Sequence, residues 1–239
     1  MGGVEPSNGA PSAQSGLSGL RLLHDPKDAF AARLWLIRSA RRTLDVQYYI
    51  WHDDLSRSLL LDEFVAAARR GVSVRLLIDD NGIGGLDARL ALLDSEPTVT
   101  VRLYNPFKMR RLQALEWLFA FRRLNSRMHA KSLTADRHAT IVGGRNIGDE
   151  YFGAQSKGQF DDLDVIARGP VAAEVEHVFE HHWESDGRVP LPPWSAAFPP
   201  ERCAEPRGRR RPWREAPQQR GFSQPPKPSR YLPTYNTGG

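Results

Sequence analysis

The stretch from Arg127 to Asn146 constrains the fold more than any other part of the chain. It reads RMHAKSLTADRHATIVGGRN, so His129, Lys131 and Asp136 are followed by Gly-Gly-x-Asn. Residues two apart on a strand point to the same face, which would place the imidazole of His129 beside the ammonium of Lys131. Asp136 falls in a turn between two runs with β-strand character. The pattern therefore predicts a hairpin with a basic pair at one end.

The residue types in this pattern suit attack on a phosphodiester. A neutral imidazole at His129 can act as the nucleophile, and the Lys131 ammonium can hold phosphate oxygens and stabilise transition-state charge. Asn146 adds an amide donor, while Gly143 and Gly144 permit a close backbone approach or a turn with positive φ. The simpler alternative, an incidental surface histidine on a hairpin, explains one His-x-Lys pair but not the whole pattern.

Asp136 completes a candidate catalytic group of three with His129 and Lys131. Its place in a turn indicates a carboxylate that supports the structure or a neighbouring group, rather than one that reacts. The candidate ligands for the substrate phosphate are Lys131, Asn146 and Gly144.

Composition bounds the class of protein. The 239 residues are 40% apolar, which is enough for one sizeable core, and the single cysteine, Cys203, excludes an internal disulfide and a Cys-rich metal site. We find no secretory signal at the N-terminus and no run of 18 apolar residues, so we expect a cytoplasmic protein, peripheral at the inner membrane.

The net charge of +5 is concentrated at one end of the chain. Nine of the 33 Lys and Arg residues, but only three of the 28 Asp and Glu residues, lie from Pro190 onward, so the rest is nearly neutral. A body that grips a nucleic-acid backbone should carry a basic excess. The charge distribution therefore makes nucleic acid an unlikely partner.

Strand and helix patterns alternate along the middle of the chain, which predicts an α/β domain with a largely parallel or mixed sheet. We expect strands over 43–51, 72–78, 99–104 and 163–167, and helices over 28–41, 56–70, 86–93 and 169–183. Asp28 is the expected cap of the first helix. His52, Asp53, Asp79 and Asp80 lie at the carboxyl ends of strands, where ligand sites form in such sheets, although ordinary loop polarity explains them equally well.

Three segments have a different character. Residues 1–20 read as a disordered leader, and residues 188–239, which hold Arg-rich and Pro-rich sequence, as a disordered basic tail or the product of a shifted reading frame. The domain would then span residues 21–187. Phe107–Leu124 has basic ends and an aromatic middle, which fits a helix on an anionic bilayer or, more simply, a packed helix with solvated ends. His177 and His181 have a metal-binding spacing but lack a third ligand, so a solvated face is the better interpretation.

The segment from about residue 21 to 187 resembles the phospholipase D superfamily, whose signature is the His-Lys-Asp (HKD) motif described above. The likeness is closest to bacterial cardiolipin synthases without transmembrane helices. It is carried by YYIWHDD at 48–54, VRLLIDDNG at 74–82, VRLYNPF at 101–107, RLNSRMHAKS at 123–132, GGRNIGDEYFG at 143–153 and DLDV at 162–165.

The resemblance implies an α-β-α sandwich and a phosphatidyltransferase. In that family a motif histidine attacks the phosphorus of a phospholipid, a phosphohistidine forms, and an alcohol then takes the phosphatidyl group. His129 would be that nucleophile or its partner, and Asp162 would orient the imidazole. No cofactor and no metal are implied, because Lys131 and Asn146 supply the charge stabilisation. The implied partners are an anionic phospholipid such as phosphatidylglycerol and the bilayer surface.

The chain departs from the family in one respect. Family synthases carry two HKD motifs, and this sequence has a single His-x-Lys pair of that kind. One histidine must attack while another protonates the leaving group. The second half could come from a homodimer partner or from another chain, or the chain is a truncated half-enzyme, which the abrupt start of the tail slightly favours. A homodimeric phosphodiesterase acting on nucleic acid and a non-enzymatic remnant are the remaining alternatives.

Overall fold

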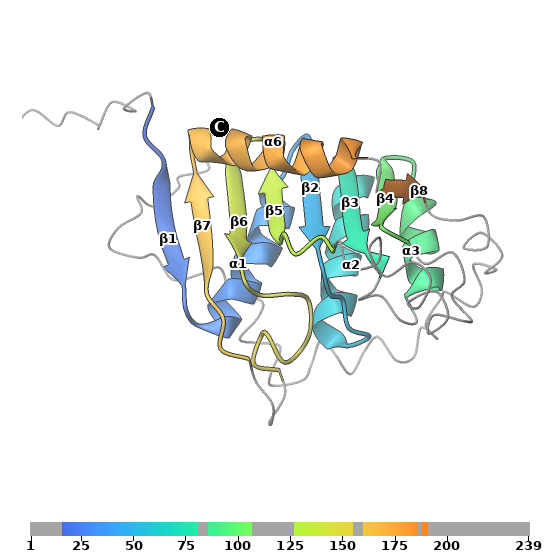
Figure 1. The fold of residues 1–239 in the computed structure, drawn as a ribbon, viewed down its shortest axis with the longest axis horizontal. Coiled ribbons are helices and arrows are strands. Elements are labelled where there is room, and N and C mark those ends of the chain that lie inside the picture. The colour runs from blue at the N-terminus through green and yellow to red at the C-terminus, as the bar shows by residue number, and fades with distance from the viewer. Residues whose placement is uncertain (1–15, 81–85, 107–126, 155–159, 186–187, 191–239) are drawn as a thin grey trace, which may run out of the picture.

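A single eight-stranded sheet organises the protein (Figure 1). The computed structural model describes residues 16–80, 86–106, 127–154, 160–185 and 188–190. The strand order across the sheet is β1 (Gly19–Leu23), β7 (Asp164–Arg168), β6 (Ala139–Gly143), β5 (Ser132–Ala135), β2 (Thr43–Tyr48), β3 (Ser73–Asp79), β4 (Val99–Tyr104) and β8 (Arg188–Pro190).

The sheet is mixed. Strands β2, β3 and β4 are parallel neighbours, as their alternation with helices predicts. The remaining pairs are antiparallel, and β5, the first strand of the β5–β6 hairpin, runs beside β2 in the opposite direction. The first residue of β5 therefore lies at the same sheet edge as the carboxyl ends of β2 and β3. The motif and the loops after those strands meet at this edge.

Helices cover both faces of the sheet, which confirms the α-β-α sandwich. Helices α1 (Pro26–Ser39), α2 (Leu55–Arg69) and α3 (Asp87–Asp94) lie behind the sheet in Figure 1, and α6 (Pro170–Glu184) crosses the front. No helix of the described part of the chain is long and apolar enough to span a bilayer.

The caps of the first two helices show why the elements begin where they do. Asp25, rather than the expected Asp28, caps α1: its Oδ1 accepts from the backbone N–H groups of Lys27 and Asp28 at 2.8 and 3.1 Å. Pro26 then occupies the first helical turn, where a missing N–H costs nothing. Asp54 caps α2 by accepting from the Arg57 N–H at 3.1 Å.

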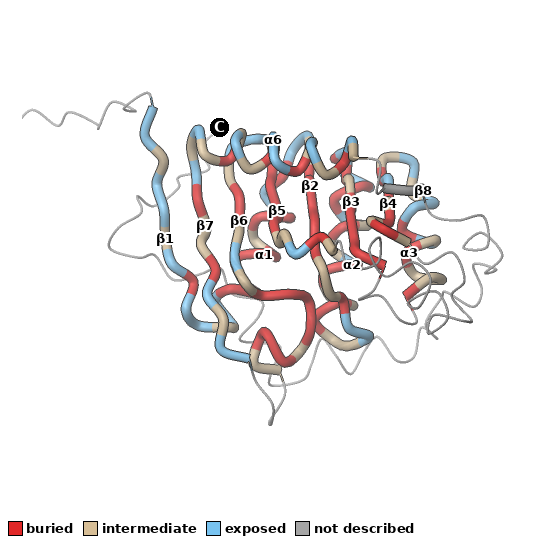
Figure 2. Tube along the Cα trace, in the orientation of Figure 1, coloured by how far each residue is buried: buried red, intermediate tan, exposed pale blue. Residues whose placement is uncertain are grey.

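Two apolar clusters of unequal size hold the layers together, and Figure 2 shows the buried chain concentrated in the strands and the helix faces toward them. The larger lies between the sheet and helices α1 and α2 and includes Phe30, Phe64 and Phe152. The smaller lies on the α6 face and consists of Leu77, Met128, Phe179 and Trp183. Met128 directly precedes His129, so the smaller cluster anchors the motif to the sheet.

Some expected segments fall elsewhere. The Phe107–Leu124 helix lies outside the described residues, as do residues 1–15 of the leader and 191–239 of the tail. Strand β1, which the sequence did not predict, begins at Gly19, two residues before the expected start of the domain. It pairs with β7 at the sheet edge, where Leu20 and Leu22 are 61% and 53% exposed and Leu23 is buried, so most of its apolar residues face solvent and give little core pattern to recognise.

Candidate active site

The residues expected to react lie immediately before β5. His129 is exposed, and its ring lies against the ring of Tyr49, with centroids 4.5 Å apart. Lys131 reaches back to the same place: its Nζ lies 5.9 Å from the Tyr49 ring centroid and donates to the His129 carbonyl at 2.8 Å. The structure therefore brings the imidazole and the ammonium together beside one aromatic ring that follows β2.

A buried carboxylate fixes the backbone that carries His129. Asp79, at the end of β3, has no exposed surface and accepts from the Met128 N–H at 3.1 Å and from Arg127 Nη1 at 3.0 Å. A hydrogen bond and a buried ion pair thus hold the two residues before His129. The sequence placed Asp79 at this sheet edge but gave no sign of its partners, which lie 48 and 49 residues later.

A second set of contacts fixes the residue after Lys131. Ser132 Oγ accepts from Gln47 Nε2 at 2.9 Å, and Gln47 Oε1 lies 3.0 Å from His182 Nδ1 on α6. Burial, and then the charge of His181, lower the pKa of His182. His182 therefore reaches the motif strand through Gln47 of β2, and the sequence interpretation singled out His177 and His181 on the same helix instead.

Asp162 supplies a negative charge beside the cation. Burial lowers the pKa of Lys131, while the Asp162 carboxylate acts in the opposite direction and favours the charged ammonium. A Cβ at Gly144 would lie 2.1 Å from Asp162 Oδ1, so only a glycine leaves room for this carboxylate. Gly143 is constrained in the same way, 2.1 Å from Asp164 Oδ1 and 2.6 Å from backbone atoms of residues 163 and 164. Close approach, not a positive φ, explains both glycines.

Asn146 connects the two loops that border the site. It is 5% exposed; its Oδ1 accepts from the Ile50 N–H at 3.1 Å, and its Nδ2 donates to the Tyr151 hydroxyl at 3.1 Å. A side-chain amide carries two N–H groups, so the contact with Tyr151 uses one of them. The amide is held in place by its neighbours before any ligand arrives.

Asp136 lies at the far end of β5 from Lys131, and the structure does not bring it to His129. Its carboxylate accepts from the backbone N–H groups of Arg41, Arg42 and Thr43, at 2.7–2.9 Å. Burial acts to raise the pKa of Asp136, but these hydrogen bonds outweigh burial and lower it. Its φ of 54°, with 59° at the next residue, is typical of a tight hairpin turn. This is the structural position that the turn pattern indicated.

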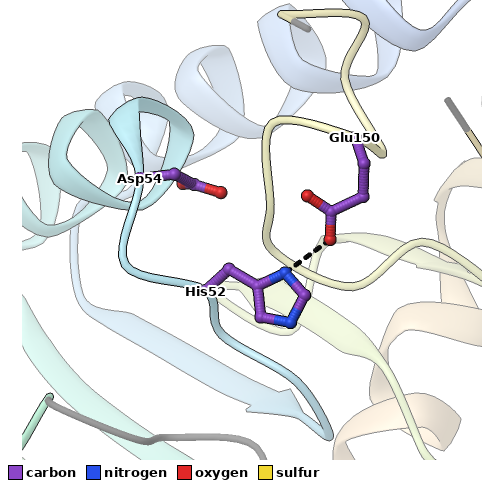
Figure 3. A group of neighbouring side chains, drawn as sticks. All are labelled: His52, Asp54 and Glu150. Carbon is purple, nitrogen blue, oxygen red and sulfur yellow. Dashed lines mark ion pairs between the residues drawn. The ribbon is translucent and has the colours of Figure 1, made fainter. Parts of the chain in front are cut away.

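A histidine–glutamate pair at the edge of the site escaped the sequence interpretation as a pair (Figure 3). His52 Nδ1 lies 2.6 Å from Glu150 Oε1; the histidine side chain is 53% exposed and the glutamate 8%. The sequence placed His52 at a strand end, and both residues occur in the runs that carry the resemblance, but their contact joins positions far apart in the chain.

Asp54 lies close enough to this pair for the three to be a candidate cation group, with ligand atoms within 4.8 Å of one another. Its carboxylate already accepts from two backbone N–H groups, those of Arg57 and Asp149, at 3.1 and 2.7 Å. The contacts of Asp54 therefore hold the start of α2 and the loop at Asp149 together.

Comparison with known proteins supplies the family. Residues 34–183 match the family described as "Cardiolipin synthase, PLD-like domain". Cardiolipin synthase C of Escherichia coli strain K12 is 53% identical over 180 residues, which are 75% of this chain and 38% of that protein. The chain thus spans about two fifths of the length of this relative.

Solved structures share the fold at low identity. Phosphatidylserine synthase of Haemophilus influenzae has a TM-score of 0.57 at 17% identity, over 82% of this chain and 43% of that one. The phospholipase D family member Nuc of Salmonella typhimurium has a TM-score of 0.53 at 16% identity, over 73% of this chain and 98% of that one. The described domain therefore has the architecture of a single phospholipase D half-domain, and the chain belongs to the cardiolipin synthase family of phospholipase D-like proteins.

Proposed function

We propose that this chain carries one half of a phosphatidyl-transfer site of the cardiolipin synthase type. The observation that carries the proposal is the grouping of the exposed His129 imidazole and the Lys131 ammonium beside Tyr49. The chain that carries this group is 53% identical to cardiolipin synthase C over 180 residues. The proposed substrate is a phospholipid phosphodiester, with phosphatidylglycerol as the first choice, presented at a membrane surface.

Each neighbouring residue has a proposed role in that reaction. A ring nitrogen of His129 attacks phosphorus, the P–O bond to the leaving alcohol breaks, and a phosphohistidine remains until an acceptor alcohol displaces the nitrogen. Lys131 and the second N–H of Asn146 bind the phosphate oxygens and stabilise charge in the transition state. Asp162 favours the charged form of Lys131, and as an imidazole acceptor it would also orient His129.

The leaving alcohol needs a proton from a second acid, which this chain's one HKD motif does not supply. A second copy of the chain, related by a two-fold axis, would supply another His129. Because the chain spans 38% of its synthase relative, a separate second half is the other source. A chain that finds neither would be a truncated half-enzyme without turnover.

The test is conversion of labelled phosphatidylglycerol, alone and mixed with phosphatidylethanolamine, to cardiolipin by the purified chain. We expect product from the wild type and none from His129→Ala. The matched control is His138→Ala, because His138 is exposed in the hairpin turn and its hydrogen bonds to the described residues are made by its backbone. Equal product from His129→Ala would refute the role of the motif, and no product from any variant would leave the truncated form as the description of this chain.

One observation favours a second candidate, a homodimeric phosphodiesterase acting on nucleic acid. The fold match covers 98% of Nuc, a chain of single half-domain size. Cleavage of DNA in the presence of a chelator, lost in His129→Ala and accompanied by no cardiolipin, would favour this candidate over lipid transfer.

A further inference from the structure

The His52–Glu150 pair belongs to the wall of the candidate active site. The segment that follows β2 runs beside the segment that follows Asn146: His52 N donates to Ile147 O at 2.9 Å, and Ile147 N donates to Ile50 O at 3.1 Å. Tyr49, which contacts His129, is three residues before His52. Three extended residues span at most about 10 Å, so His52 lies within the length of a small substrate from the reacting histidine.

The contact with Glu150 orients the His52 imidazole. Nδ1 and Oε1 are 2.6 Å apart, the separation of a close ion pair. A proton on Nδ1 would face the carboxylate, whereas a lone pair there would be repelled by it, so we take Nδ1 as the donor and Nε2 as the nitrogen left for a ligand. Figure 3 shows that other ring nitrogen on the side of the ring away from Glu150.

Gly148 and the burial of Glu150 fix the orientation of the His52 ring. Glu150 is 7% exposed, and a Cβ at Gly148 would lie 2.6 Å from Glu150 Oε1, so the glycine leaves the space that the carboxylate fills. The exposed imidazole is thus held from behind by a buried carboxylate, and its other nitrogen makes no hydrogen bond to the described residues.

The charges around His52 select the kind of ligand. Glu150 and Asp54 both present carboxylates within 4.8 Å of the imidazole, so a second phosphate would be repelled. A cation between His52 and Glu150 is also disfavoured, because ligands about 2.0–2.2 Å from a zinc ion lie more than 3 Å apart in a tetrahedral site. A neutral hydroxyl suits the site, since it can donate to Nε2 or accept from a charged imidazolium.

We propose that His52, oriented by Glu150, binds a hydroxyl of the polar group attached to the reacting phosphate, such as the glycerol of phosphatidylglycerol. The proposal rests on the proposed function, because it takes the phosphate to lie at His129 and Lys131. Glu150 is a positioning residue that sets the tautomer, and His52 makes the contact.

Two soluble probes separate head-group binding from phosphate binding. Dihexanoyl phosphatidylglycerol and dihexanoyl phosphatidylmethanol are both singly charged phosphodiesters, and only the first has free head-group hydroxyls. Their dissociation constants would be measured by calorimetry, below micelle formation, on wild type, His52→Ala, Lys131→Ala and His177→Ala. The last removes an exposed histidine on α6 and serves as the matched control.

We expect wild type and His177→Ala to prefer phosphatidylglycerol by roughly three- to ten-fold, the net effect of one or two hydrogen bonds. His52→Ala should bind both probes equally and as tightly as wild type binds phosphatidylmethanol, while Lys131→Ala should weaken both. In ¹⁵N NMR spectra, wild-type His52 should be the Nδ1–H tautomer at neutral pH, and Glu150→Gln should shift that signature.

The outcomes distinguish this inference from the proposed function. Turnover by the wild type with no preference between the probes would overturn the inference alone. A preference that disappears in His52→Ala, without any turnover, would support the head-group site and count against the reaction. An unchanged preference in His52→Ala, or no binding of either probe, would overturn the inference.

Discussion

Removing the Asp79 carboxylate should be among the most damaging single changes near the site. Asp79→Ala leaves the Met128 N–H and the Arg127 guanidinium without this acceptor, in a place where Asp79 is 0% and the Arg127 side chain 5% exposed. Breaking a buried charge pair by removing one partner costs about 3–5 kcal/mol. We therefore expect the free energy of unfolding to fall by that amount.

The assay is urea denaturation of wild type and variant, followed by tryptophan fluorescence, with Glu63→Ala as the matched control. Glu63 pairs with Arg38 at 2.6 Å, but their side chains are 21% and 48% exposed. A solvated pair of this kind contributes only about 0–1 kcal/mol. Hydrogen exchange at residues 127–131 should also speed up in Asp79→Ala, since the backbone before His129 loses its anchor.

Equal costs in the two variants would refute this reasoning, because burial would then make no difference to the worth of the pair. A large loss of stability without faster exchange at 127–131 would refute the narrower statement that Asp79 holds the segment bearing His129. Asp79→Asn provides a third comparison. It keeps one oxygen acceptor and loses the charge, so its free energy of unfolding should lie between those of Asp79→Ala and the wild type.

Three further changes test neighbouring features. Gly143→Ala should destabilise the fold by about 1–3 kcal/mol in urea titrations, because the new Cβ would meet backbone at 2.6 Å. At Gly144 the atoms nearest to a new Cβ belong to the Asp162 side chain, which can move, so Gly144→Ala should cost under about 1 kcal/mol yet reduce turnover by displacing that carboxylate. Equal stability costs for the two glycine variants would contradict this explanation. Asp136 has a lowered pKa, so its stabilisation is full above its unfolded pKa and is lost as pH falls through the folded value. The deficit of Asp136→Asn should therefore shrink on acidification between pH 6 and pH 3, and a deficit that stays constant would contradict the linkage.

Local pattern was sufficient to predict the parts of the fold that depend on neighbours in sequence. Strand β4 has the predicted limits of Val99 and Tyr104, and the hairpin follows from the turn around Asp136. The first cap was misplaced by three residues, because Asp25 and Asp28 both precede a helical pattern and only the packed structure selects between them.

Pairs distant in sequence were beyond prediction from one sequence. Asp79 at the end of β3 meets the backbone of Met128, and His52 meets Glu150, but nothing in the local sequence around either pair indicates the contact. The glycines show the same limit: the motif has glycine at 143 and 144, but the carboxylates that leave no room for a Cβ belong to Asp164 at the start of β7 and to Asp162 just before it.

The spacing of the motif has a geometric explanation in the sheet. Lys131 and Asp136 are separated by the four residues of β5, Ser132–Ala135. The strand therefore carries the chain from the site, at one end of the strands, to the turn at their opposite end. Strand β6, Ala139–Gly143, returns it, which brings Gly144 back beside Asp162 and Lys131. A motif that runs out and back cannot place its aspartate with its histidine. Asp136 can act on the site only through the backbone of β2, whose first residues it holds and whose far end leads to Tyr49.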